Sequence, residues 1–256
     1  MKKYLFIIIP LAVLSFALQA APAYAAVAID ATSSPTESAL NTTSVSLTYT
    51  VGSGSNRALV AHLSWAGCTP LPTGISVTWD SGGTNQAMTL MASSSNTSDP
   101  GLTQLWGLVA PTSGNKTLKA SWTNGCTTGS ANLAALSVTG ANQTGGTTTF
   151  AQATSSTNTN SSWTQTVVSA SGDLAVTGSG SVNTVPTPTN QTTWYSVQGA
   201  NAENSGASYA AGASTVSFSY SGGGWSGYYE IVGFDIVAAA GGSAPTHYTS
   251  ILTFNW

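Results

Sequence analysis

The chain has 256 residues, of which 41% are hydrophobic and only 5% are charged, and its formal net charge is −3. Eight tryptophans and many aliphatic residues can fill a core, which excludes the intrinsically disordered class. A nucleic-acid-binding role needs a basic face that neutralises phosphates, and five Lys and Arg residues in the whole chain do not supply one.

The first 25 residues have the three parts of a bacterial secretory signal peptide. Lys2 and Lys3 precede a mainly apolar run, which is followed by small residues that end in the tripeptide AYA. The run is shorter than the roughly 20 residues that span a bilayer, and Pro10 interrupts it. We therefore expect residues 1–25 to be a signal peptide and the mature chain to be secreted to the cell surface, with no transmembrane anchor.

Alternation of apolar and polar residues predicts strands in the first part of the mature chain. Residues 43–51 alternate without exception, with Val45 and Tyr49 on one face and hydroxyl-bearing residues on the other. In residues 57–65, Leu59 and Trp65 share a face. His62 lies on the other face, where we expect a surface or half-covered residue and not a ligand.

Residues 102–122 predict a hairpin, two strands joined by a short loop that begins at Pro111. In the second strand Leu118 and Trp122 fall on one face, as in a half-buried strand. The first strand is apolar on both faces around Leu105 and Trp106, which predicts a strand covered on both sides in the middle of a sandwich.

The rest of the chain continues with short strands and turn signals. Residues 150–162 are rich in Ser, Thr and Asn and predict a loop or a weak edge strand. About a dozen short strands and no helical period predict an all-β, antiparallel β-sandwich of the jelly-roll kind, with one domain over residues 26–237. We expect residues 238–256 to be a linker and a strand-like tail. The tail is either a last strand of the sandwich, the start of a further module, or a strand donated to another subunit.

Two cysteines remain in the exported chain, and both lie in loop-like sequence. Cys68 and Cys126 each follow a strand that carries a tryptophan. An oxidising compartment favours their pairing, and the loop-entropy model gives a stabilisation of about 4 kcal/mol for so long a loop. A free nucleophilic thiol is the alternative, but no His or charged activator is near either cysteine in the sequence. We therefore expect a disulfide.

Short turn-and-strand segments follow one another in a fixed order over nearly the whole mature chain. They include SNRALV at 55–60, VTW at 77–79, QAMT at 86–89, LWGLVAPTSG at 105–114, LSVTGANQT at 136–144 and GDLAV at 172–176. In this order they resemble a widespread bacterial extracellular β-sandwich module. The resemblance implies a β-sandwich and a place in large secreted or surface proteins, in a family without assigned catalytic residues. Asp80 and Ser81 depart from it, because a Gly-Gly turn is usual there, and the cysteine pair is an addition.

The sequence offers little catalytic chemistry. A glycoside hydrolase needs two carboxyls on one side of a cleft, but Glu230 and Asp235 are an odd number of residues apart and should point to opposite faces of a strand. His62 and His247 are the only imidazoles, so a catalytic triad has few possible bases. The two histidines and two cysteines are not spaced as zinc ligands are. The remaining acids are scattered in loops or at strand starts: Asp30, Glu37, Asp80, Asp99, Asp173 and Glu203.

We therefore predict no catalytic residues, no metal ligands and no cofactor, with a structural calcium ion on loop oxygens kept as an alternative. The favoured function is secreted binding or adhesion, with polysaccharide or other surface proteins as partners. For a glycan, Trp225 is the best candidate because a glycine-rich loop would display its ring, and the other candidates are Trp194, Tyr195 and Tyr229. A structural subunit or spacer of an extracellular assembly is the alternative, and a glycoside hydrolase the least favoured reading.

Overall fold

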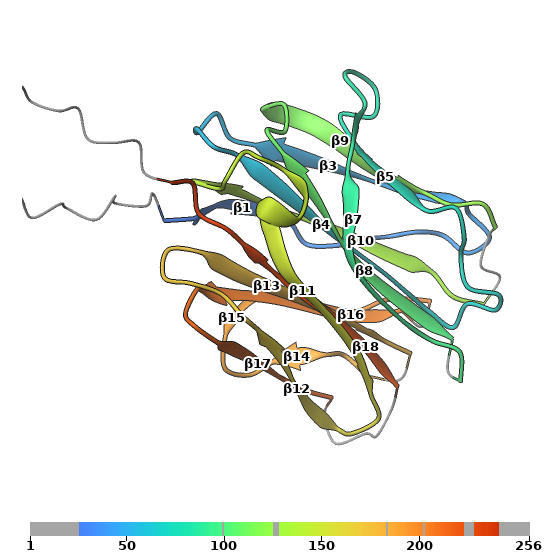
Figure 1. Cartoon of the computed structure of the whole chain (residues 1–256). Coiled ribbons are helices and arrows are strands. Elements are labelled where there is room, and N and C mark those ends of the chain that lie inside the picture. Colours follow the sequence, from blue (N-terminus) through green and yellow to red (C-terminus); the bar gives the residue numbers. More distant parts are fainter. Residues whose placement is uncertain are drawn as a thin grey trace, which may run out of the picture.

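The computed structural model describes residues 26–98, 100–124, 128–182, 184–201, 203–222 and 228–240. Within these residues the protein is all-β, apart from one turn of 3-10 helix at Gly146–Thr148 (Figure 1). All strand pairs are antiparallel. The predicted all-β antiparallel sandwich is confirmed. Residues 1–25, the predicted signal peptide, and residues 241–256 of the predicted linker and tail lie outside the described residues.

The first half of the chain builds two sheets. The outer N-terminal sheet has the order β3-β9-β5-β6, and the inner N-terminal sheet has the order β1-β10-β4-β8-β7, with β2 paired to β10. Their strands are β1 (Ala28–Thr32), β2 (Thr36–Glu37), β3 (Ser44–Val51), β4 (Ala58–Ala66), β5 (Ser76–Trp79), β6 (Gln86–Ala87), β7 (Thr89–Asn96), β8 (Gly101–Val109), β9 (Gly114–Ser121) and β10 (Ala131–Thr139).

The second half of the chain builds two more sheets. The inner C-terminal sheet has the order β11-β18-β13-β16-β15, and the outer C-terminal sheet has the order β12-β17-β14. Their strands are β11 (Phe150–Asn158), β12 (Ser162–Val167), β13 (Leu174–Ser181), β14 (Thr187–Pro188), β15 (Thr192–Gln198), β16 (Asn204–Ala211), β17 (Val216–Ser221) and β18 (Tyr229–Ile236).

Three hydrophobic cores show that the four sheets are stacked as layers (Figure 1). The two N-terminal sheets enclose the first core, which contains Trp65, Trp79 and Trp122 as predicted. The two inner sheets enclose the middle core, to which Leu105 contributes from β8 and Phe234 from β18. The two C-terminal sheets enclose the third core. Each inner sheet is therefore covered on both faces.

The layering explains which strands alternate and which do not. On β3, in an outer sheet, Val45 and Tyr49 are buried while Ser46 and Thr48 are exposed. On β8, in an inner sheet, the residues from Gly101 to Gly107 are all buried, because Leu105 packs into the middle core and Trp106 into the first. The prediction that this strand is covered on both sides is confirmed.

Two expectations about strand arrangement differ from the structure. The strands at 101–109 and 114–121 belong to different sheets and do not pair, because the chain at residues 110–113 crosses from the inner to the outer N-terminal sheet. The described residues form 18 strands in four sheets, more than the dozen strands expected. Part of the difference lies in β2, β6 and β14, which are two residues long and too short to leave an alternating pattern.

Candidate functional site

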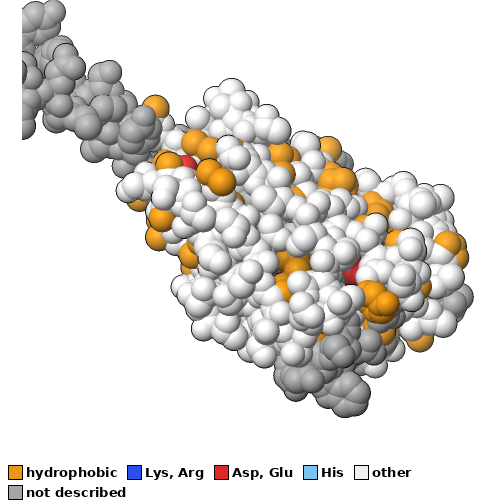
Figure 2. Space-filling model, turned by 60° about the horizontal axis from the view of Figure 1, so that its bottom comes forward, with side chains coloured by type: hydrophobic (Ala, Val, Ile, Leu, Met, Phe, Trp, Pro, Cys, Tyr) orange, Lys and Arg blue, Asp and Glu red, His pale blue; other side chains and the backbone are white. Residues whose placement is uncertain are grey.

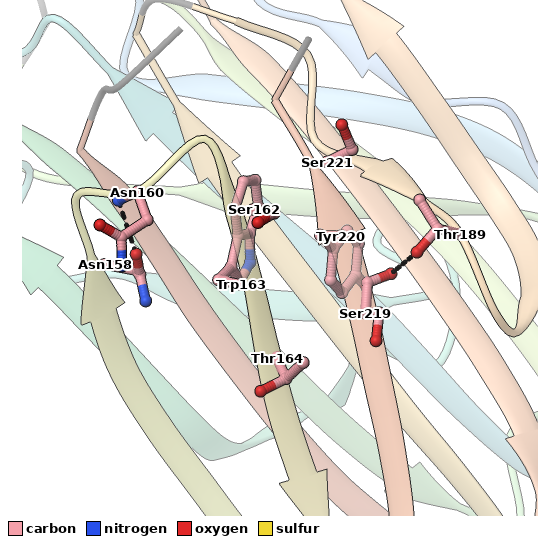
Figure 3. Close-up of a pocket in the computed structure, with 9 residues that line it drawn as sticks. All are labelled: Asn158, Asn160, Ser162, Trp163, Thr164, Thr189, Ser219, Tyr220 and Ser221. Carbon is pink, nitrogen blue, oxygen red and sulfur yellow. Dashed lines mark hydrogen bonds between the residues drawn. The ribbon is translucent and has the colours of Figure 1, made fainter. Parts of the chain in front are cut away.

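A surface hollow of about 450 Å³ lies at one end of the outer C-terminal sheet, and its lining is mainly hydroxyl and amide groups (Figure 3). Asn158 is the last residue of β11, Asn160 lies in the turn between β11 and β12, and Thr189 follows β14. The other lining residues belong to two paired strands: Ser162, Trp163 and Thr164 on β12, and Ser219, Tyr220 and Ser221 on β17.

Strand register gives the hollow a hydroxyl-bearing floor. Ser162 pairs with Ser221 and Thr164 pairs with Ser219, so that four hydroxyl-bearing side chains stand on the same outward face. This arrangement continues along the two strands, where Thr166 pairs with Ser217. We call these six residues the hydroxyl face. Its side chains alternate with buried ones, as expected for a sheet with one face in water.

Local hydrogen bonds fix the walls of the hollow. The Asn158 side-chain oxygen accepts from the Asn160 N–H at 2.7 Å, which holds the turn after β11. On the other wall, both the N–H and the hydroxyl of Thr189 donate to the Ser219 carbonyl, at 2.9 and 3.1 Å. Figure 3 shows these contacts on either side of the two central strands. The polar groups are therefore positioned before any ligand arrives.

Beneath the hollow, three aromatic rings form a stack. The Trp163 ring lies with its centre 3.7 Å from that of Tyr229 and 5.6 Å from that of Tyr220. All three side chains belong to the third core and are less than 5% exposed. The stack gives the floor a rigid base, but it does not offer an open ring face to a ligand.

The predicted ligand-binding aromatics occupy buried positions where the structure describes them. Trp194 and Tyr195 pack in the middle core, and the Trp194 ring N–H donates to the Ser33 carbonyl. Tyr229 is completely buried under Trp163. These three rings are therefore not surface platforms for a sugar. Trp194 and Tyr195 are the buried residues of the edge strand β15, and β18 is buried along its whole length. Trp225 lies outside the described residues, so its role stays a prediction.

His62 is fully buried, which corrects the expectation of a surface or half-covered residue. It lies on β4, an inner strand, and its ring sits where a side chain on Gly178 of the facing sheet would be. The Tyr195 hydroxyl and His62 Nδ1 form a short hydrogen bond. Burial lowers the pKa of His62 to about 3, so the imidazole is neutral, and burial also raises the pKa of Tyr195.

Next to His62, polar side chains face one another across the two inner sheets. Register places Asn132, Ser64 and Thr103 side by side on β10, β4 and β8 of the inner N-terminal sheet. The facing sheet contributes Glu203, Ser205 and Glu230, and the Asn132 side-chain amide donates to the Ser205 hydroxyl at 3.0 Å. We call these six residues the polar seam. None is more than 4% exposed.

Two of the polar seam's residues are glutamates that lie near each other. Burial raises the pKa of Glu203 well above its usual range. The nearby Ser64 hydroxyl lowers the pKa of Glu203 and so opposes the effect of burial. The hydroxyl and the Glu203 carboxyl do not meet the geometric criteria of a hydrogen bond. The charge of Glu230 raises the pKa of Glu203 further. The sequence places Glu203 correctly at a strand start, but it does not show that the fold brings Glu203, just before β16, close to Glu230 on β18.

The other carboxyl pair is Asp173 and Asp235, at the opposite end of the inner C-terminal sheet. Asp235 accepts a hydrogen bond of 2.6 Å from the Ser169 hydroxyl. Glu230 and Asp235 do point to opposite faces of β18, since Glu230 packs over Gly101 of the inner N-terminal sheet, while Ser169 follows β12 of the outer C-terminal sheet. The geometry that argued against these two as a catalytic pair is confirmed.

Cys68 is fully buried, and the described residues contain no free cysteine. Cys126 lies outside the described residues, so the structure does not show the bond that the sequence predicts. No helix in the described part of the chain is long and apolar enough to cross a membrane. Among the same residues, no three His, Cys, Asp or Glu side chains gather as they would around a metal ion.

Comparison with protein-family models gives no match, and no curated protein is significantly similar to the chain. The assignment of the site therefore depends on its geometry. Sequence reasoning missed both the hydroxyl face and the polar seam. In residues 162–166 and 217–221, serines and threonines at alternate positions indicate that one face of each strand is exposed. No local signal in the sequence shows that the two strands pair.

Proposed function

We propose that this protein is a secreted, non-catalytic binding module of the bacterial surface, and that it binds an uncharged, hydroxyl-rich ligand such as a polysaccharide. The observation that carries the proposal is the hollow at the hydroxyl face, whose nine lining residues include no charged side chain. Hydroxyl and amide groups both donate and accept hydrogen bonds, so they match the hydroxyls of a sugar, whereas an ionic ligand would need charged partners.

The exterior of the molecule supports the same ligand class. The face shown in Figure 2 is mostly uncharged, with scattered apolar atoms and few acidic atoms, and its described residues show no Lys or Arg side chain. Such a surface provides little long-range attraction for an anionic polymer. A neutral ligand held by many hydrogen bonds is therefore more consistent with the surface than nucleic acid or an anionic membrane.

An aromatic ring can assist at the edge of the hollow. Among the described residues Tyr228 is the aromatic side chain with substantial exposure, at 37%. It directly precedes Tyr229, which pairs with Asn158 in the wall of the hollow. A phenol ring in this position can lie against the apolar face of a sugar ring while Asn158 bonds to its hydroxyls.

Secretion and the disulfide belong to the same proposal. The charged, apolar and small-residue order of residues 1–25 supports export, and the resemblance to an extracellular β-sandwich module supports the same location. The oxidising environment outside the cell favours the disulfide between Cys68 and Cys126 that we propose. Mass spectrometry of the unreduced protein should show a mass two hydrogens below that of the dithiol form. An unchanged mass after reduction would contradict this part.

A glycan array followed by calorimetric titration tests the ligand class. The protein should bind at least one neutral polysaccharide, and Thr164→Lys should weaken binding by at least about tenfold, because a charged four-carbon chain would occupy the floor of the hollow. Thr48→Lys is the matched control, since Thr48 is an exposed strand threonine in the outer N-terminal sheet. This control should bind as the parent does.

Three results would contradict the proposal. Equal loss of binding in Thr164→Lys and Thr48→Lys would remove the hollow as the site, and exclusive binding to anionic glycans would remove the neutral ligand class. Release of reducing sugar from a bound polysaccharide would show that the protein is not simply a binding module. Tyr228→Ala separates the contribution of ring contact from that of hydrogen bonding, because it removes the Tyr228 ring and leaves the hydroxyl face intact.

A structural subunit of an extracellular assembly is the second candidate, and one observation favours it. A mainly apolar groove of about 440 Å³ lies beside β7, the edge strand of the inner N-terminal sheet. Leu71, Ile75 and Leu90 contribute to its lining, and Leu90 is 42% exposed. Exposed apolar grooves at sheet edges are typical of subunit contacts. Sedimentation at rising concentration should then show oligomers that Leu90→Lys reduces.

A further inference from the structure

The polar seam places two carboxyls in the middle of the molecule, away from the charged side chains of Lys116 and Arg57. Glu203 and Glu230 are at most 1% exposed. Lys116 forms an ion pair with Asp80 at 3.4 Å, on the far side of the first core. Arg57 directly precedes β4 and donates to the Gly54 and Pro111 carbonyls. Ser64, the seam residue on that strand, is seven residues further along, or roughly 23 Å at strand rise.

Two of the surrounding hydroxyls, those of Ser64 and Thr103, have no protein partner to account for their burial. The Thr103 and Ser64 hydroxyl oxygens and both carboxyl oxygens of Glu203 are buried without a hydrogen bond. Buried polar atoms are nearly always bonded to protein or to another bound species, because leaving one unbonded costs about 1–3 kcal/mol. Several such atoms in one place indicate that a bound species completes the seam.

Register and glycine positions show that these oxygens converge. Gly180 lies between Glu230 and Ser205 in the inner C-terminal sheet. A Cβ atom on Gly180 would stand 2.5 Å from the Thr103 hydroxyl oxygen and 3.6 Å from Glu203 Oε1, with Ser64 Cβ 3.3 Å away. The absence of a side chain at Gly180 thus allows oxygen atoms from both inner sheets to approach the same point.

We propose that the polar seam is a binding site for a hard divalent cation, with calcium as the ion of choice, held by the carboxyls of Glu203 and Glu230 and the hydroxyls of Ser64 and Thr103. Carboxylate and hydroxyl oxygens are hard ligands, and two carboxylates balance a double positive charge in a region of low dielectric. The ion joins the two inner sheets, because Ser64 and Thr103 belong to one of them and the glutamates to the other.

The position of the seam allows the ion to enter. Glu203 directly precedes β16, Glu230 is the second residue of β18, and Thr103 is the third residue of β8. The seam is thus close to the ends of its strands, where local opening costs less free energy than in the middle of a sheet. This site differs from the surface hollow, which is lined by other residues and carries the proposed ligand binding.

Calcium titration of the chelator-treated full-length protein tests the proposal. Calorimetry should show one site, and a hundredfold excess of calcium over the Kd should raise Tm by roughly 5–10 °C, since the ion binds only the folded chain. Glu203→Gln should abolish the rise, and Thr103→Val, which keeps the shape but removes the hydroxyl, should weaken affinity by about tenfold or more. Both variants are compared with and without calcium, so their own stability does not affect the comparison.

Glu37→Gln is the control, because the Glu37 carboxylate already accepts N–H groups of Ala200 and Asn201 and is not part of the seam. It should keep the full calcium response. No change in Tm with calcium or magnesium, or the same rise in the parent and in Glu203→Gln, would overturn the proposal. If Glu203→Gln does not fold, Thr103→Val decides alone, and an undiminished response in that variant would overturn the hydroxyl's role as a ligand.

Discussion

Asp235 shows how a single carboxyl links the stability of the third core to pH. Its side chain is 2% exposed, on the face of β18 that the outer C-terminal sheet covers. Burial raises its pKa to about 7, the hydrogen bond from Ser169 acts in the opposite direction, and the neighbouring carboxyl of Asp173 raises the pKa again. A protonated Asp235 can donate a hydrogen bond to Asp173, so the folded state holds a proton that the unfolded chain releases.

From this shift we expect the contribution of Asp235 to stability to fall as pH rises. Because the folded pKa of Asp235 lies above its unfolded value of about 3.9, its contribution is fully present below about pH 4 and is lost as pH rises through 7. The loss is at most on the order of 4 kcal/mol, at about 1.4 kcal/mol per pKa unit. Urea denaturation of the parent and of Asp235→Asn from pH 4 to 8 measures it. The stability of the parent relative to Asp235→Asn should fall as pH rises, because the contributions of His62 and Glu203, whose pKa values are also shifted, are common to both proteins.

Glu37 provides a control of the opposite sign. Burial works against its ionisation, but hydrogen bonds from Ser130, Ala200 and Asn201 outweigh burial and lower its pKa. The contribution of Glu37 is therefore present above the unfolded pKa of about 4.3 and lost at lower pH. Glu37→Gln should leave the profile between pH 5 and 8 unchanged. A stability difference between the parent and Asp235→Asn that does not change with pH would contradict the role of Asp235.

At the scale of the element, polar side chains of the facing sheet pack against the glycines of β13. A Cβ atom on Gly178 would lie 2.4 Å from His62 Nε2, so the imidazole can pack there only because residue 178 has no side chain. Thr103 approaches Gly180 in the same manner, and on the other sheet Gly101 makes room for the carboxyl of Glu230. Glycine in a strand commonly marks such a close approach.

Gly178→Ala should therefore lower the free energy of unfolding by about 1–3 kcal/mol, through overpacking against His62. The loss should be smaller in a His62→Ala background, where the ring is absent, so a double-mutant cycle should show coupling between the two positions. Gly82→Ala is the matched control, because no heavy atom lies within 4 Å of its added Cβ, and it should change stability by less than about 0.5 kcal/mol. Equal losses at Gly178 and Gly82 would contradict the packing argument.

The alternation of apolar and polar residues predicted which face of a strand is buried, but not which strands pair. It correctly placed Trp65, Trp79 and Trp122 in a core, because the face of a strand is a local property. It gave no information on which strand lies next to which, so β8 and β9 were expected together although they belong to different layers. His62 was misplaced for the same reason, since its polar side chain suggested an outer face and only the stacking of two inner sheets covers it.

At the scale of the whole molecule, the two halves of the chain share the middle core. Strands β1–β10 build one pair of sheets and β11–β18 the other, and both contribute to this core. Pairing over long sequence distances also creates the hollow, where Ser162 meets Ser221, and the seam, where Glu203 approaches Thr103 from the other half of the chain. A sequence read locally contains no signal for such meetings, so neither site could be predicted from it.

Because each half would expose a large apolar face without the other, we expect the protein to unfold in one transition, in which the calorimetric and van't Hoff enthalpies agree. Leu105→Ala, in the middle core, and Leu118→Ala, in the first core, should each cost about 2–5 kcal/mol and lower a single Tm by several degrees. If the halves unfolded separately, scanning calorimetry would resolve two peaks, and Leu118→Ala would move one of them. A single peak that moves in both variants shows that the middle core couples the two halves, and two peaks would contradict this coupling.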